Sequence, residues 1–81
     1  MTVHEIENVL DSFLYDSRRR HVTDRECNIF SDAEGFRALD ATFALMEFER
    51  RYPCDLNKAV KLISSFTLRQ MAEALLVSLY N

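Results

Sequence analysis

The residues with side chains that could do chemistry are few and scattered. His4, His21, Cys27 and Cys54 are the candidate soft metal ligands, but their spacing matches no zinc site. Neither histidine lies near an obvious nucleophile in the sequence, and the single glycine excludes a glycine-rich phosphate loop. We therefore expect no catalytic residue, no metal site and no enzymatic activity. A Cys–His pair assembled by the fold stays open as the alternative.

The one basic run, Arg18-Arg19-Arg20-His21, has two interpretations. It could bind a phosphate, a nucleic acid or an acidic partner. It could also be a solvated helix end, where cations meet the negative end of the helix dipole. We favour the helix end because the chain is acidic overall, with a formal net charge of −3. That charge gives no support for nucleic acid as the main partner.

Composition indicates one small helical domain over residues 1–81. The chain contains one glycine and one proline, whereas a β-rich domain needs several turn residues with special dihedral angles. With 48% apolar and 28% charged residues, it is too apolar for disorder and too often interrupted by charge to span a membrane. The early acidic residues Glu5 and Glu7 are unlike a secretory signal. We therefore expect a cytoplasmic protein with free, mostly buried thiols and no membrane association.

Four helices are predicted, three long and one short. Capping boxes, in which two residues three apart satisfy each other's free backbone N–H groups, predict the starts of the first and last helices. Pro53 ends the second helix. The expected helices extend from Thr2 to about Ser17, over 37–51, over 56–63, and from Thr67 onward.

Apolar residues at helical spacing predict which side of each helix is buried. The expected core stripes are Val3, Ile6, Leu10, Phe13 and Leu14; Ala41, Leu45, Phe48 and Tyr52; Leu56, Val60 and Ile63; and Leu68, Met71, Leu75 and Leu79. Residues 21–36 form a connection of about 16 residues, which we expect Ile29 and Phe30 to attach to the core. Such a length usually belongs to a functional or topological crossover.

A set of residues at fixed spacings marks the long loop and the boundaries of the later helices. Phe30 lies in the long loop, Gly35-Phe36-Arg37-Ala38-Leu39 opens the second helix, Tyr52 ends it, and Thr67-Leu68 opens the last. This layout resembles that of acyl and peptidyl carrier proteins. In that family a loop Phe precedes Gly-x-Asp-Ser-Leu, an aromatic residue ends the second helix, and a Thr-hydrophobic pair opens the last. The resemblance implies a small all-α, four-helix bundle of the carrier-protein type.

The family's serine holds a phosphopantetheine arm through a phosphodiester, which requires a hydroxyl. Ala38 occupies that position here and has none, and Arg37 replaces the preceding Asp. The resemblance therefore implies a degenerate carrier with no phosphopantetheine cofactor. Two alternatives stay open: the arm is attached to Ser17 or Ser31, or position 38 is naturally a serine.

In carrier proteins the second helix docks partner enzymes and usually presents carboxylates to them. Here Phe43 and Met46 lie off the core stripe of that helix. We interpret them as docking anchors; the alternative is that they pack under the long loop. From Arg37 to Arg51 three positive and three negative charges cancel, which weakens steering by an acidic helix. The expected polar rim consists of Arg37, Asp40, Glu47 and Arg50.

The expected function is therefore non-catalytic binding of a protein partner, an enzyme of acyl, polyketide or peptide biosynthesis. A functional carrier is the second hypothesis. The third is a small helical adaptor that acts through Arg18–His21. Phe43 and Met46 could also form a homodimer.

Overall fold

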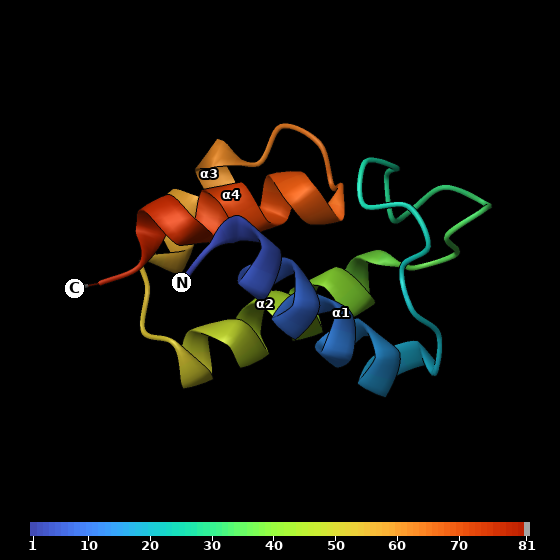
Figure 1. Cartoon of the computed structure of the whole chain (residues 1–81), viewed down its shortest axis with the longest axis horizontal. Helices are drawn as coiled ribbons and strands as arrows, with labels where there is room; N and C mark the ends of the chain where they lie inside the picture. Colours follow the sequence, from blue (N-terminus) through green and yellow to red (C-terminus); the bar gives the residue numbers. More distant parts are fainter. Residues whose placement is uncertain (81) are drawn as a thin grey trace.

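The computed structural model describes residues 1–80 and contains four helices around one core (Figure 1). The helices are α1 (Val3–Arg18), α2 (Ala38–Arg51), α3 (Leu56–Leu62) and α4 (Leu68–Ser78). These bounds confirm the predicted small all-α, four-helix bundle. Where a helix start or end was predicted, the observed one differs from it by no more than about a residue. In the described part of the chain, β-structure is limited to two isolated bridges. None of these helices is both long enough and apolar enough to cross a membrane.

Side chains at the helix starts explain where the helices begin. The predicted capping box of α1 is present: Thr2 Oγ1 accepts from the Glu5 N–H at 3.1 Å, and Glu5 accepts from the Thr2 N–H at 2.8 Å. Thr67 caps α4 by accepting from the Gln70 N–H. The second half of that predicted box is wrong, because the Gln70 side chain accepts from the Ser64 N–H instead, at 2.7 Å.

Helix α1 lies between α2 and α4, and α3 packs against α4 (Figure 1). The predicted stripes of α1, α2 and α4 are buried or half-buried in this core. In the predicted stripe of α3, Leu56 and Ile63 are half-buried, but Val60 is exposed rather than directed inward. The short α3 buries Ala59. Because successive side chains on a helix point about 100° apart, the side chain of the next residue, Val60, points away from the core.

The long connection between α1 and α2 is attached to the core by Ile29 and Phe36, both buried. The Ile29 N–H donates to the Phe66 carbonyl at 2.8 Å, and the Phe36 N–H donates to the Ile29 carbonyl at 2.9 Å. The expectation for Phe30 is wrong in part. Its side chain is exposed and packs against the Phe66 ring at a tilt, with 5.1 Å between ring centroids.

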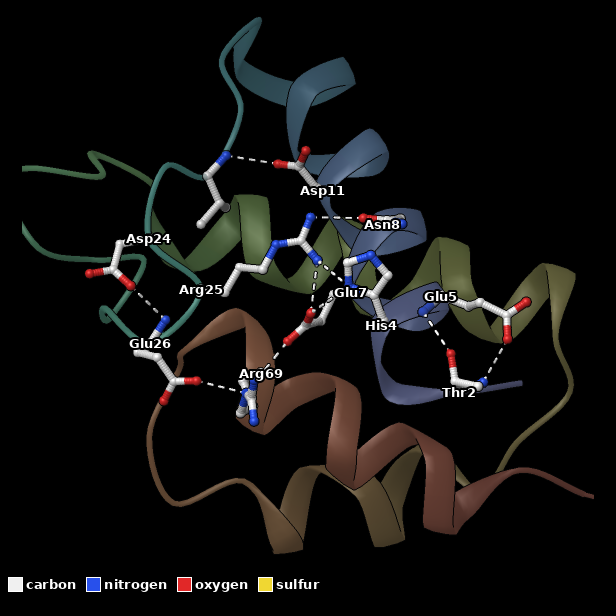
Figure 2. Close-up of polar contacts among 11 residues, drawn as sticks. Thr2, His4, Glu5, Glu7, Asn8, Asp11, Asp24, Arg25, Glu26 and Arg69 are labelled. Carbon is white, nitrogen blue, oxygen red and sulfur yellow. Dashed lines mark hydrogen bonds and ion pairs between the residues drawn. The ribbon is translucent and has the colours of Figure 1, made fainter.

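A buried carboxylate from α1 joins the connection to α4 (Figure 2). Glu7 Oε1 accepts from Arg25 Nη1 of the connection at 2.8 Å, and Arg69 Nε of α4 lies 3.8 Å from Glu7 Oε2. Arg69 also pairs with Glu26 at 2.7 Å. Charges drawn from three separate segments therefore keep the connection close to the bundle.

A second buried carboxylate organises the connection internally. Glu34 accepts from the Thr23 N–H at 2.9 Å, from the Thr23 hydroxyl at 2.7 Å and from the Asp24 N–H at 3.2 Å. Burial raises the pKa of Glu34, but these hydrogen bonds and nearby Arg20 outweigh burial and lower the pKa below its ordinary value. The carboxylate therefore stays charged and holds the turn at 23–24.

Candidate functional site

Helix α2 is apolar on two opposite sides. One side enters the core through Ala41, Ala44, Leu45 and Phe48. On the other side Leu39 is 82% exposed, Phe43 39% and Met46 54%. These three residues follow the i, i+4, i+7 spacing and share one helix side; we call them the apolar stripe. A surface helix ordinarily presents polar residues there.

The exposure of Phe43 and Met46 agrees with the predicted apolar spot. Leu39 is a third member of the stripe that sequence reasoning missed, because it counted there only as the last residue of the Gly35–Leu39 motif that opens the second helix. Its position four residues before Phe43 was the available signal. A row of three exposed apolar side chains differs from single ones, which are ordinary on protein surfaces.

Asp40 is not a rim residue, because its side chain is buried. Its Oδ1 accepts from the Ser17 hydroxyl, and its Oδ2 accepts from Arg18 Nε at 2.9 Å and from the Arg37 N–H at 2.8 Å. Burial raises the pKa of Asp40, but these hydrogen bonds outweigh burial and lower the pKa below its ordinary value. Asp40 therefore joins the start of α2 to the end of α1.

The other predicted rim residues lie at the surface or near it. Arg37 directly precedes α2 and is exposed. The Arg50 side chain is 75% exposed, and its Nη1 lies 2.9 Å from Oε1 of Glu47, which is only 23% exposed. Arg51 is also exposed and lies over the Phe13 ring of α1 at 5.2 Å. We call Arg37, Arg50 and Arg51 the arginine rim.

An open apolar groove of about 250 Å³ lies beside the stripe. It is lined by Phe30, Ala38, Ala41, Thr42, Leu45, Val60 and Phe66. Among these lining residues, Thr42 carries a hydroxyl, and this hydroxyl donates to the Ala38 carbonyl at 3.0 Å. The groove can therefore receive an apolar side chain but presents no activated nucleophile.

The basic run at the end of α1 is held by contacts within the chain. Arg18 pairs with Asp40. Arg19 ends α1 in the left-handed conformation, with φ of 58°, and its guanidinium lies 5.8 Å from the centre of the Tyr15 ring. These contacts support the interpretation of the run as a helix end.

The rest of the run is engaged in the same way. The Arg20 guanidinium lies so close to Gly35 that a Cβ there would be 2.6 Å from Arg20 Nη1. His21 Nδ1 lies 2.7 Å from Asp11, and its ring stacks on Tyr15. All four residues of the run are nevertheless exposed, so the adaptor hypothesis stays a prediction.

The two alternative attachment serines have hydroxyls engaged in contacts within the chain. Ser17 donates to Asp40, and Ser31 accepts from the Glu34 N–H at 3.3 Å. Ser31 is also half-buried, with its Oγ 3.3 Å from Cys27 Sγ. Neither resembles the exposed first position of α2, which Ala38 occupies.

The histidines and cysteines lie apart from the apolar stripe. Cys54 is buried, and burial, together with Glu49 and Asp55, raises the pKa of its thiol, which disfavours the reactive thiolate. His4 lies 3.6 Å from Glu7. Within residues 1–80, no three or more histidine, cysteine or acidic side chains come together as a candidate metal site.

The positions that carry the carrier resemblance lie at helix boundaries. Ala38 is the first residue of α2, Tyr52 directly follows its last residue, and Thr67 caps α4. Comparisons with protein-family models, with curated proteins and with solved structures found no match to this chain. The carrier resemblance therefore stays a hypothesis.

Proposed function

We propose that this chain is a non-catalytic binding module that docks a partner protein through the outward side of α2. The observation that carries the proposal is the apolar stripe of Leu39, Phe43 and Met46 on a helix whose opposite side is already in the core. Apolar surface left in water forgoes about 25 cal/mol per Å² of burial. Aromatic residues and Met are also enriched at interface centres.

The attachment of α2 to the bundle supports this role. Asp40 fixes its start to α1, and Phe48 is fully buried on its inner side. A surface that is already ordered loses less conformational entropy on binding than a mobile one. The stripe is therefore presented on a rigid element.

The proposal includes the expected family role: an acyl-carrier-like domain without an arm, which binds an enzyme of acyl, polyketide or peptide biosynthesis. Its support is the position of Ala38 at the exposed start of α2. A methyl group at that position cannot form the phosphodiester of a phosphopantetheine arm.

Substituting Met46 with aspartate is expected to abolish retention of the partner, because it places a charge on the apolar stripe. The matched control is Val77→Asp on α4, because Val77 is 58% exposed and lies outside the stripe. The measurement is affinity capture of wild type and both variants with quantitative mass spectrometry. Circular dichroism checks that helix content is unchanged.

If a protein is retained by wild type and by Val77→Asp but is lost by Met46→Asp, the apolar stripe is its docking surface. Equal retention by all three would show that α2 is not the binding surface. Met46 is preferred to Phe43 for this test, because more of the Phe43 side chain is covered by the bundle. A Phe43 substitution therefore risks changing the fold as well.

The functional-carrier hypothesis is tested by intact mass. After incubation with coenzyme A and a promiscuous phosphopantetheinyl transferase, the wild-type chain is expected to gain no mass, because Ser17 and Ser31 have engaged hydroxyls. The Ala38→Ser variant measures whether the missing oxygen is the main obstacle. A gain of one phosphopantetheine by the wild-type chain would replace the binding-only proposal with a working carrier.

A further inference from the structure

We infer that the partner presents an acidic amphipathic helix to α2. Its apolar side would cover the stripe, and its carboxylates would meet the arginine rim. This inference rests on the proposed function, because it specifies the chemistry of the partner at the same surface.

Burial changes the charge balance of α2 from the one its sequence indicates. Asp40 is buried and paired with Arg18, so its charge does not reach a partner. Glu47 is mostly covered and bound to Arg50. Glu49 is exposed, but it borders a separate hollow with Cys54 and Asp55.

The arginines at the two ends of the stripe are more exposed than Asp40 and Glu47. The Arg50 side chain is 75% exposed although it is paired with Glu47. Arg51 is exposed although it lies over the Phe13 ring. Arg37 lies before Leu39, while Arg50 and Arg51 follow Met46. In the sequence the charges from Arg37 to Arg51 cancel. The charged residues of this segment that are exposed in the structure are the three arginines and Glu49, while Glu47 is partly covered. Complementary charge gives an interface its specificity and speeds encounter, so the matching partner surface is acidic.

The shape of the surface favours a helix as the partner element. From Arg37 to Arg50 the helix rises roughly 20 Å at 1.5 Å per residue. A partner helix of similar length would place apolar residues at i, i+3, i+4 and i+7 along the stripe. The groove of about 250 Å³ beside α2 would receive an apolar side chain from the edge of that helix.

Charge also argues against a second copy of this chain as the occupant of this surface. In an antiparallel α2 pair of two copies, Arg37 of each copy would approach Arg50 and Arg51 of the other; in a parallel pair, like arginines would face each other. Both arrangements bring positive charges together, which costs binding energy.

The test uses two synthetic amphipathic peptides that share one row of leucines. One has glutamates beside the row, and the other has lysines. Fluorescence anisotropy measures their binding to the full chain at low and moderate salt. We expect the glutamate peptide to bind at least tenfold more tightly at low salt, and the difference to narrow as salt screens the rim.

Variants assign the effect to named residues. The double variant Arg37→Glu/Arg50→Glu is expected to reverse the preference, while Lys61→Glu on α3 is expected to leave it unchanged. Met46→Asp is expected to weaken both peptides at least tenfold. If both peptides bind equally and Met46→Asp abolishes the binding of both, the inference of an acidic partner is overturned. The docking surface proposed on α2 would then still stand.

Three further outcomes would overturn the inference. The first is that neither peptide binds. The second is that the chain forms dimers in a concentration-dependent way in sedimentation and that Met46→Asp abolishes these dimers. A second copy of the chain would then be the occupant of the surface. The third is binding to phosphatidylserine vesicles that requires Met46 and exceeds binding of the glutamate peptide, which would make a membrane the occupant.

Discussion

Replacing Asp40 with alanine is expected to lower the free energy of unfolding by about 3 kcal/mol, because a hydrogen bond to a charged group contributes about 1.5–3 kcal/mol and loss of a helix cap costs about 1 kcal/mol. The carboxylate accepts from Ser17, Arg18 and the Arg37 backbone while buried. Urea denaturation followed by circular dichroism measures the loss. The matched control is Asp16→Ala, an exposed aspartate on α1, which is expected to change stability by less than about 0.5 kcal/mol.

The effect of Asp40→Ala should also depend on pH. The pKa of Asp40 in the folded chain lies below its ordinary value of 3.8, so the charged form stabilises the fold. That stabilisation is fully present above the ordinary pKa and is lost as the pH falls through the lowered pKa. The stability difference between wild type and variant should therefore be largest near pH 7 and shrink below about pH 4. A difference that stays constant from pH 7 to pH 3 would contradict the role of the charge.

The same variant separates a structural role of Asp40 from a docking role. Because Asp40 is buried, we expect the variant to lose stability. The affinity of each folded molecule for the partner should stay unchanged. A loss of affinity at full stability would instead place Asp40 in the interface. The family pattern implies the second result, whereas the contacts with Ser17 and Arg18 favour the first.

Truncating Phe48 to alanine is expected to cost about 4 kcal/mol, because a large buried aromatic leaves a cavity that the surrounding side chains fill only in part. Phe48 is fully buried, and its ring packs against Tyr52 with 5.0 Å between centroids. Stability of about 0.05–0.15 kcal/mol per residue gives a chain of this length roughly 4–12 kcal/mol in total. The loss therefore removes a third or more of the total, and a chain at the lower end of that range would be substantially unfolded at 25 °C.

Met46→Ala is the matched control for Phe48→Ala, because Met46 lies on the opposite side of the same helix. Its truncation is expected to change the free energy of unfolding by less than about 0.5 kcal/mol. The measurement is urea denaturation of both variants beside wild type. Similar losses from the two substitutions would mean that the outward side of α2 is covered by the bundle and is no docking surface.

Helix positions and most of the core are predictable from amino-acid spacing. Thr2 and Glu5 lie three residues apart and cap α1 with their own side chains. Ile6, Leu10, Phe13 and Leu14 repeat at the helical period and are all buried. Such signals are local, because the capping partners and the repeat belong to one segment.

Short or irregular segments are less predictable. Val60 follows the apolar pattern of α3 but is exposed, since a helix of seven residues buries little beyond Ala59. In the long connection, Phe36 enters the core while Phe30 lies at the surface. A loop has no fixed period, so its residue spacing does not tell which aromatic side chain points inward.

The candidate site shows the same division between local and long-range information. Residue spacing places Phe43 and Met46 off the core stripe of α2. Whether they and Leu39 are exposed depends on which side of a doubly apolar helix its neighbours cover. Asp40 likewise has the sequence context of a surface carboxylate, and only the end of α1, 22 residues earlier at Arg18, buries and pairs it. Periodicity is a property of one segment, whereas burial and charge pairing depend on contacts between segments that only the folded chain brings together.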